Sequence, residues 1–313
     1  MMIPNEVVLS VYIITLFTGF PLNLIALYTF SSKVYRKPAP IDIFLLNLTV
    51  SDLVFLLFLP LKIYEAYSQM KWYLPYFLCP ITGFVFFSTI YISTLFLTAV
   101  SVERYLGVAF PIRYKVNRKC IYAVLACIFF WMISTAQCSI VYIVQFMKTN
   151  KNQTNDTRCY DDFTSDQLRI LLPVRFSLGI SLFFVPLLIT LFCYINFIRI
   201  LNSLPHIRKS KQQRAIAMAV VTLIVYIVCF LPYNISHIVG FIQNESPSWR
   251  VEALLPSAFN ASLDPIIFYF SSSAVKKNCI TFLTRVTKKL GMSCSRLVQK
   301  SYENNDCDEQ TSS

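Results

Sequence analysis

The residues best suited to bind an anion are two arginines and a histidine. Arg175, His237 and Arg250 each lie in, or directly beside, a different long apolar segment. A guanidinium group is planar and presents paired N–H donors, which match the two oxygens of a carboxylate. A cation in lipid is costly, by roughly 2.5 to 3.5 kcal/mol at the bilayer centre, so it needs an anionic partner. Because the neighbouring segments supply few carboxylates of their own, the pattern predicts a site for an anionic ligand.

The composition indicates that these segments cross a lipid bilayer. Of the 313 residues, 56% are hydrophobic and only 14% are charged, and the mean hydropathy is +0.56. A helix needs about 20 apolar residues to span the hydrocarbon core. The stretches that reach this length are 7–30, 41–66, 77–102, 120–146, 168–200, 214–242 and 251–272. The sequence therefore predicts an all-α fold, a seven-transmembrane helical bundle with a short amphipathic cytoplasmic helix after the seventh span.

The basic residues predict how this bundle is oriented. Most of the 28 Lys and Arg residues fall in loops and a tail that are cytoplasmic if the N-terminus is outside. The net charge of +12 is thus assigned to a membrane-facing inner rim, and not to a nucleic-acid surface. The expected regions are an extracellular N-terminus, the bundle, the amphipathic helix and a disordered cytoplasmic tail, at 1–6, 7–273, 274–290 and 291–313.

The long loop after the fourth span has two features of an extracellular segment. Cys159 lies in this loop and Cys79 opens the third span, so an oxidising exterior permits one disulfide bond between them. Asn152-Gln-Thr and Asn155-Asp-Thr in the same loop are acceptor sequences for N-glycosylation.

Several polar residues lie well inside the spans. Asn23, Asp52, Ser93 and Asp264 fall in the first, second, third and seventh spans. An intramembrane carboxylate must be paired, neutralised or bound to an ion. If Asp52 and Asp264 face one cavity, they would suit a sodium ion with oxygen ligands and water. The alternative is a hydrogen-bond network that joins helices, which is the interpretation favoured for Asn23.

A series of motifs occurs in a characteristic order along the chain: Asn23, Asp52, Glu103-Arg104-Tyr105, Trp131, Pro186 with Tyr194, Cys229-Phe230-Leu231-Pro232 and Asp264-Pro265-Ile266-Ile267-Phe268. Over about residues 7–290 this series resembles the rhodopsin-like (class A) G-protein-coupled receptors. The resemblance implies that the activation and G-protein-contacting residues are Glu103, Arg104, Tyr105, Tyr194, Phe230 and Pro232. Phe230, Asp264 and Phe268 stand where the family usually has Trp, Asn and Tyr. We therefore expect the mechanics of the last two spans to differ from the common pattern.

Two ligand classes of that family are excluded by missing residues. A retinal pigment needs a Schiff-base lysine in the seventh span, and 251–272 contains no Lys. An amine receptor needs a carboxylate in the outer half of the third span, and nothing acidic occurs from Cys79 to Val102.

Local sequence is similar to the free fatty acid receptors, and most similar to their short-chain branch. The matching stretches are Leu172-Pro173-Val174-Arg175, Pro232-Tyr233-Asn234-Ile235-Ser236-His237, Ser248-Trp249-Arg250 and Asn260-Ala261-Ser262-Leu263-Asp264-Pro265. The resemblance implies that Arg175, Arg250 and His237 hold a carboxylate, and that Tyr91 and Tyr233 line the pocket. Gln137 stands where the mammalian short-chain receptors have a histidine. Glutamine can hydrogen-bond but cannot carry charge, so it puts the preferred chain length in question.

The expected function is a plasma-membrane receptor for small carboxylates such as acetate, propionate and butyrate. The resemblance implies coupling to heterotrimeric G proteins of the Gi/o class and, in the short-chain type, also Gq, with arrestin and membrane lipids as further partners. Apart from the sodium ion, no metal, cofactor, nucleic-acid partner or enzymatic activity is expected. A receptor for longer fatty acids or hydroxy acids is an alternative. An anion transporter is another, although it would favour inverted repeats and broken helices, which the sequence does not show.

Overall fold

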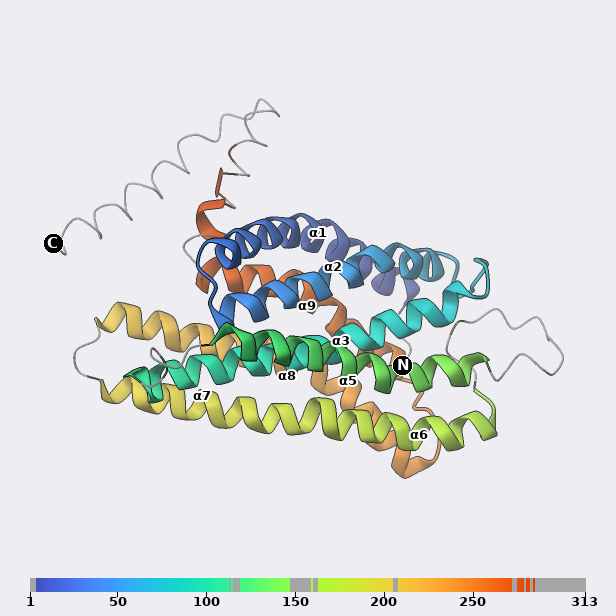
Figure 1. Ribbon diagram of the computed structural model, residues 1–313. Helices are drawn as coiled ribbons and strands as arrows, with labels where there is room; N and C mark the ends of the chain where they lie inside the picture. The colour runs from blue at the N-terminus through green and yellow to red at the C-terminus, as the bar shows by residue number, and fades with distance from the viewer. Residues whose placement is uncertain are drawn as a thin grey trace.

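The computed structural model describes residues 4–112, 114, 119–146, 159, 163–204, 208–271, 275–278, 280, 281 and 284. Within these ranges the regular structure is helical, and the helices run side by side along one long axis (Figure 1). The two glycosylation sequons, the tail 291–313 and most of the expected amphipathic helix lie outside the described residues.

The helices correspond to the expected spans. In chain order they are α1 (Asn5–Arg36), α2 (Pro40–Tyr67), α3 (Leu78–Ala109), α5 (Cys120–Phe146), α6 (Ser165–Gly179), η2 (Ile180–Phe184), α7 (Val185–Ser203), α8 (Lys209–Gln243) and α9 (Arg250–Ser271). α6, the π-helical segment η2 and α7 are continuous and together form the fifth span. Within the described residues, 6 helices are long and apolar enough to cross a membrane, and α9 adds the seventh element of the bundle. The predicted all-α seven-helix bundle is confirmed.

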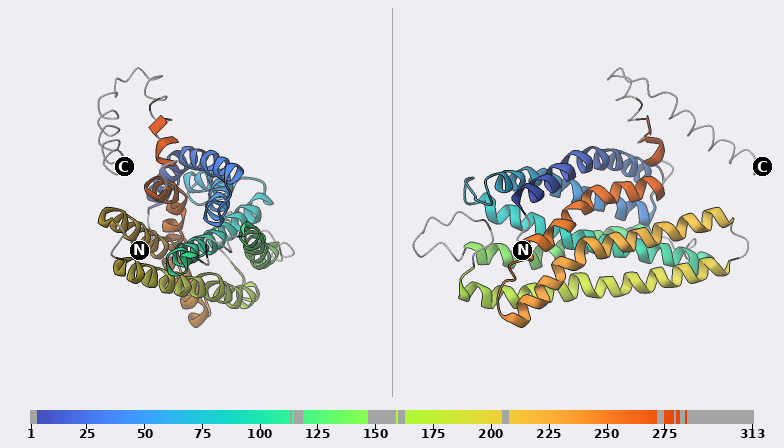
Figure 2. Two further views of the ribbon diagram at one scale, coloured as in Figure 1. Left: turned by 60° about the vertical axis from the view of Figure 1, so that its left-hand side comes forward. Right: turned by 180° about the vertical axis from the view of Figure 1, so that it is seen from behind.

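α3 occupies the middle of the bundle. It packs against α2, α5, α7, η2 and α8, and most of its residues from Cys79 to Ser101 are buried. α8 lies between α9 and α7, as the view from behind shows (Figure 2). α1 and α9 pack together on the side of the bundle away from α6 and α7. The fifth and sixth spans therefore pack directly on the central helix, while the seventh packs on α8, α1 and α2.

The disulfide bond between Cys79 and Cys159 is present, as the sequence predicted. It ties the first turn of α3 to a residue 80 positions later. We call this end of the bundle the disulfide end, and the end that contains the α7–α8 connection the opposite end.

α1 and α9 approach each other closely at a glycine. A Cβ atom on Gly19 would lie 3.1 Å from the Ser262 Oγ and 3.2 Å from the Ala261 carbonyl oxygen. Asn23 Nδ2 donates to the carbonyl oxygens of Gly19, at 3.0 Å, and Ala261, at 2.7 Å. Thr18 Oγ1 donates to Ser262 Oγ at 2.9 Å. Small residues that let backbones approach, with polar side chains bonded across the gap, are a common form of membrane helix packing.

The close contact at Gly19 leaves no room for a large side chain. Gly19→Leu should force α1 and α9 apart and destabilise the receptor by about 1–3 kcal/mol, because a tightly packed site cannot accept the added side chain. Thermal unfolding of the purified receptor in detergent measures the change. Phe17→Leu is a control in the same helix, since the Phe17 side chain is 74% exposed. Equal unfolding temperatures for Gly19→Leu and the unmodified receptor would contradict the prediction.

Candidate ligand-binding site

The three side chains chosen for anion binding are brought together in the disulfide half of the bundle. Arg175 comes from α6, His237 from α8, and Arg250 is the first residue of α9. All are buried, with exposed fractions of 3%, 2% and 4%. Both guanidinium groups are close enough to exert an electrostatic effect on the His237 ring. Three separate helices thus place nitrogen-bearing side chains around one region.

The turn between α8 and α9 explains the position of Arg250. α8 is capped at its C-terminal end by Asn244, which adopts a left-handed conformation (φ 55°) that Asn tolerates better than most residues. The chain then folds back on Gly240, where a Cβ atom would lie 3.0 Å from the Glu245 carbonyl oxygen and 3.1 Å from Pro247 Cδ. The Arg250 N–H donates to the Pro247 carbonyl at 3.1 Å and starts α9. This tight return sets the first residue of α9 against the end of α8.

The same turn contacts Arg175. Arg175 Nη1 donates to Ser246 Oγ at 3.4 Å. On another side, the guanidinium carbon lies 5.1 Å from the centre of the Phe163 ring, a cation–π distance. These contacts orient the guanidinium group between the start of α6 and the α8–α9 turn.

Aromatic rings pack against His237. The Tyr233 ring meets the His237 ring edge-on, with centres 4.4 Å apart, and Phe87 stacks on Tyr233 at 5.8 Å. Tyr91 is buried, and its hydroxyl lies 3.5 Å from Asn234 Oδ1. Among the described residues, the buried Nδ1 of His237 has no hydrogen-bond partner. Buried polar atoms of this kind are uncommon and call for a ligand, an ion or a water.

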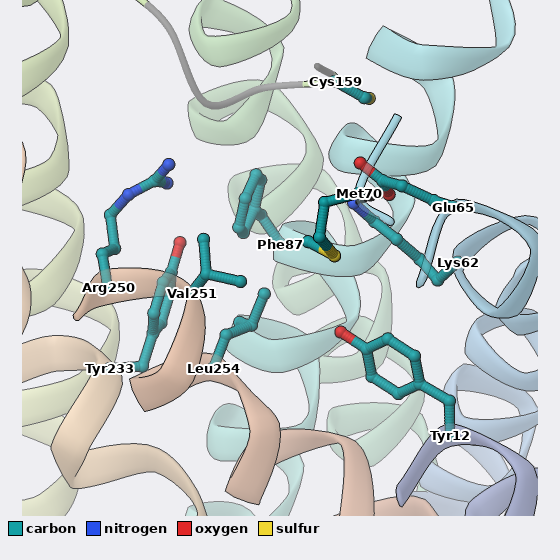
Figure 3. Close-up of a pocket in the computed structure, with 10 residues that line it drawn as sticks. All are labelled: Tyr12, Lys62, Glu65, Met70, Phe87, Cys159, Tyr233, Arg250, Val251 and Leu254. Carbon is teal, nitrogen blue, oxygen red and sulfur yellow. Dashed lines mark hydrogen bonds and ion pairs between the residues drawn. The ribbon is translucent and has the colours of Figure 1, made fainter. Parts of the chain in front are cut away.

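A cavity opens beside this cluster (Figure 3). Its lining consists of Tyr12, Lys62, Glu65, Met70, Phe87, Cys159, Tyr233, Arg250, Val251 and Leu254. Arg250 and Tyr233 border it on one side, while Lys62, Glu65 and Tyr12 border it on the other. Its volume is about 40 Å³, whereas a single water needs roughly 10–15 Å³ by the same measure. The cavity therefore has room for a molecule of only a few heavy atoms.

The remaining predicted pocket residues lie at different distances from this cavity. Arg175, His237 and Tyr91 are not part of its lining, although Tyr233 links His237 to it. Gln137 is half-buried on α5 and accepts a hydrogen bond from Ser181 Oγ in η2 at 3.5 Å. The structure thus brings two arginines, the histidine and two tyrosines together, while Gln137 belongs to a contact between helices.

Lys62 and Glu65 form an ion pair whose location the sequence did not reveal. The Lys62 Nζ lies 2.7 Å from Glu65 Oε2, and the Glu65 side chain is almost completely buried. Residues three positions apart on one helix are neighbours, so the spacing alone is compatible with such a pair. Its position in the cavity wall, like that of Tyr12, depends on which helix face turns inward, and a span that is apolar all round does not show this. Met70 lies in the turn after α2.

A second, smaller cavity lies deeper in the bundle. Its volume is about 10 Å³, and Asp52, Ser93, Asn260 and Phe230 are among its lining residues. Asn260 Nδ2 donates to Asp264 Oδ2 at 2.7 Å. Within the described part of the chain, Asp52 Oδ2 and Asp264 Oδ1 have no hydrogen-bond partner. Asp52 and Asp264, the two carboxylates that the sequence singled out, are also close enough to interact electrostatically.

At the opposite end, Glu103 and Arg104 have separate neighbours. Glu103 accepts a hydrogen bond from the Tyr114 hydroxyl, and Arg104 lies beside the buried Tyr194. The ion pairs between described residues do not include one between Glu103 and Arg104. The Tyr105 ring packs edge-on against other aromatic rings. Tyr114 was missed in the sequence because a tyrosine after the third span has no distinguishing pattern.

Comparison with known proteins agrees with this architecture. The family described as 7 transmembrane receptor (rhodopsin family) matches residues 22–268. Mouse free fatty acid receptor 2 is 49% identical over 87% of this chain and 84% of its own length. Human free fatty acid receptor 3 is 46% identical over 89% of this chain and 80% of its own, and human free fatty acid receptor 2 is 47% identical. The chain therefore belongs to the rhodopsin family of seven-transmembrane receptors and, within it, to the free fatty acid receptors.

Proposed function

We propose that this receptor is activated by short-chain fatty acids such as acetate, propionate and butyrate. The observation that carries the proposal is the convergence of Arg175, His237 and Arg250, all buried and from three different helices. In addition, the relatives are named as receptors for free fatty acids. In the proposed complex the carboxylate lies between the two guanidinium groups and accepts their paired hydrogen bonds.

Burial strengthens such a contact. Charge-assisted hydrogen bonds are stronger than neutral ones, and attraction between charges rises as the surroundings become less polar. The unpartnered His237 Nδ1 is a polar group that a nearby ligand or its bound water would satisfy. Tyr233 borders the same cavity as Arg250.

The small cavity favours a short ligand over a long one. The best small ligands gain about 1.5 kcal/mol per non-hydrogen atom, so acetate would gain at most about 6 kcal/mol. That corresponds to a Kd of tens of micromolar at best. A receptor of this kind responds to an abundant metabolite, at tens of micromolar to millimolar concentrations.

The proposed orientation places the disulfide end outside the cell, with Asn152 and Asn155 glycosylated. The opposite end then faces the cytoplasm, where Arg208, Lys209 and Lys211 begin α8. Basic residues are enriched in cytoplasmic loops. At that end the receptor would bind heterotrimeric G proteins of the Gi/o class and also Gq, and afterwards arrestin.

We further propose that Asp52 and Asp264 bind a sodium ion. Both carboxylates have an oxygen without a partner among the described residues, and Ser93 lines the same cavity as Asp52. The cavity volume of about 10 Å³ suits one ion or one water. A sodium ion there would offset the repulsion between two buried carboxylates.

Replacing either arginine tests the carboxylate site. Arg175→Ala and Arg250→Ala should each raise the half-maximal concentration of propionate by roughly 10-fold to 100-fold, because a hydrogen bond to a charged group contributes about 1.5–3 kcal/mol. Second-messenger assays at matched surface expression measure this. Arg169→Ala, at an exposed position of the same helix as Arg175, is the control. Unchanged dose–response curves for both variants would refute the site.

The preferred chain length separates this proposal from its alternatives. Titration of straight-chain carboxylates from two to sixteen carbons should give the strongest responses at two to four carbons. Greater potency at twelve to sixteen carbons would instead indicate a long-chain receptor.

Labelled acetate should not accumulate in vesicles that contain the protein, whereas accumulation would indicate a transporter. Pertussis toxin separates signalling through Gi/o from signalling through Gq.

The sodium site has a readout that does not depend on signalling. Sodium chloride, compared with potassium chloride at equal ionic strength, should raise the unfolding temperature of the purified receptor by a few degrees, because a ligand that binds only the folded state stabilises it. Asp52→Asn should remove the difference between the two salts. Equal unfolding temperatures in both salts for the unmodified receptor would argue against a sodium ion.

A further inference from the structure

The cavity beside Arg250 is polar on two opposite sides and apolar between them (Figure 3). Arg250 and Tyr233 border it on the first side. On the second side, Lys62 and Glu65 of α2 border it together with Tyr12 of α1. The apolar side chains that lie between the two sides in this view are Phe87, Val251 and Leu254. A ligand that extends into the cavity from Arg250 therefore meets apolar surface first and the ion pair last.

The Lys62–Glu65 ion pair is held in place by several neighbours. The Lys62 ammonium lies 2.7 Å from Glu65 Oε2 and 5.8 Å from the centre of the Phe86 ring, a cation–π distance. The two side chains are only 14% and 2% exposed. Tyr12 packs edge-on against the same Phe86 ring and is close enough to Glu65 to interact with it electrostatically. This side of the cavity is thus a fixed, charged wall.

The turn after α2 closes the cavity next to this pair. Gln69 and Met70 both adopt left-handed backbone conformations, with φ of 57° and 61°, which are uncommon for residues other than glycine. The Met70 N–H donates to the Glu65 carbonyl oxygen at 2.9 Å. The chain therefore folds back over the end of α2, and the Met70 side chain joins the cavity lining beside Lys62.

A charged wall discriminates between the groups that a ligand can carry at its far end. A methyl group that displaces water from an ion pair offers no hydrogen bond in return, so the contact costs free energy. A hydroxyl group differs, because it can accept a hydrogen bond from an ammonium and donate one to a carboxylate. The wall formed by Lys62 and Glu65 therefore disfavours an alkyl chain that reaches it and accommodates a hydroxyl at the same position.

We propose that Lys62 and Glu65 determine specificity at the end of the ligand away from its carboxylate. They set the upper limit of alkyl chain length, and they favour a short carboxylate with a terminal hydroxyl group. This inference rests on the proposed function, because it requires the carboxylate to lie at Arg175 and Arg250. The methyl end of a short acid then stays among the apolar side chains, whereas a longer chain reaches the ion pair.

Two acids of equal size separate the chemistry of the wall from the volume of the cavity. 4-Hydroxybutyrate and pentanoate have the same number of non-hydrogen atoms, and a hydroxyl in the first replaces the terminal methyl of the second. In second-messenger assays on the unmodified receptor, the half-maximal concentration of 4-hydroxybutyrate should be lower by roughly threefold to tenfold, the effect of about one hydrogen bond. Equal potency, or greater potency of pentanoate, would overturn the inference.

Removal of the ion pair should change the preference. Lys62→Leu combined with Glu65→Ala removes both charges together and so leaves no unpaired charge in the bundle. The ratio of the half-maximal concentrations of hexanoate and propionate should fall roughly fourfold to fifteenfold, because each methylene group in apolar surroundings strengthens binding about fourfold. The advantage of 4-hydroxybutyrate over pentanoate should disappear. Because both readouts compare ligands on one receptor, a general loss of structure or expression would not produce them.

The matched control is Lys33→Leu combined with Asp42→Ala, which removes an ion pair of 3.3 Å at the opposite end of the bundle. It should leave both ligand comparisons as they are in the unmodified receptor. An unchanged hexanoate-to-propionate ratio in the Lys62 and Glu65 double variant, or an equal fall in the control, would overturn this inference alone. If the unmodified receptor responds to no carboxylate, the proposed function fails and this inference fails with it.

Discussion

The structure depends on one constraint, which is that a polar group buried among membrane helices must find its partner inside the protein. The Asn23 amide nitrogen meets it by donating to carbonyls of its own helix and of α9, and the Thr94 hydroxyl meets it by donating to a carbonyl of the fifth span. Lys62 and Glu65 meet it with each other. The bonds of Asn23 and Thr94 join one helix to another and so constrain how the helices pack.

Some buried polar atoms do not meet this constraint within the described residues. Three of them, the His237 Nδ1 and one oxygen each of Asp52 and Asp264, lie at the sites proposed to bind a ligand or an ion. They lie in two places along the bundle, the cationic cluster and the smaller cavity region. A multi-pass receptor of the plasma membrane, which is not an enzyme, has to carry a change from one end to the other. An unsatisfied polar group in such a bundle is one that a ligand, an ion or a water can complete.

Much of the architecture was predictable from the sequence because bilayer thickness sets the length of each span. The observed limits of α5 agree with the expected ones, and Cys79 and Cys159 were predicted as partners. α3, in contrast, continues to Ala109, well beyond the expected end at 102. Glu103 and Arg104 are thus inside a helix, which charge alone made look like its end. Their separate contacts with Tyr114 and Tyr194 come from other parts of the chain and leave no local pattern.

By itself the sequence determined a membrane bundle of seven spans, and it identified the two arginines, the histidine and the two carboxylates. That the protein is a receptor came from its resemblance to a known family. These conclusions follow from residue type and run length, because charge in lipid is costly wherever the helix turns. Only the tertiary structure decided which side chains meet. The return of the α8–α9 turn onto Gly240 places Arg250, and the packing of α5 on η2 directs Gln137 to Ser181. The physical reason is that spans apolar on every face carry little periodicity, so the direction in which each polar side chain points is set by packing between helices.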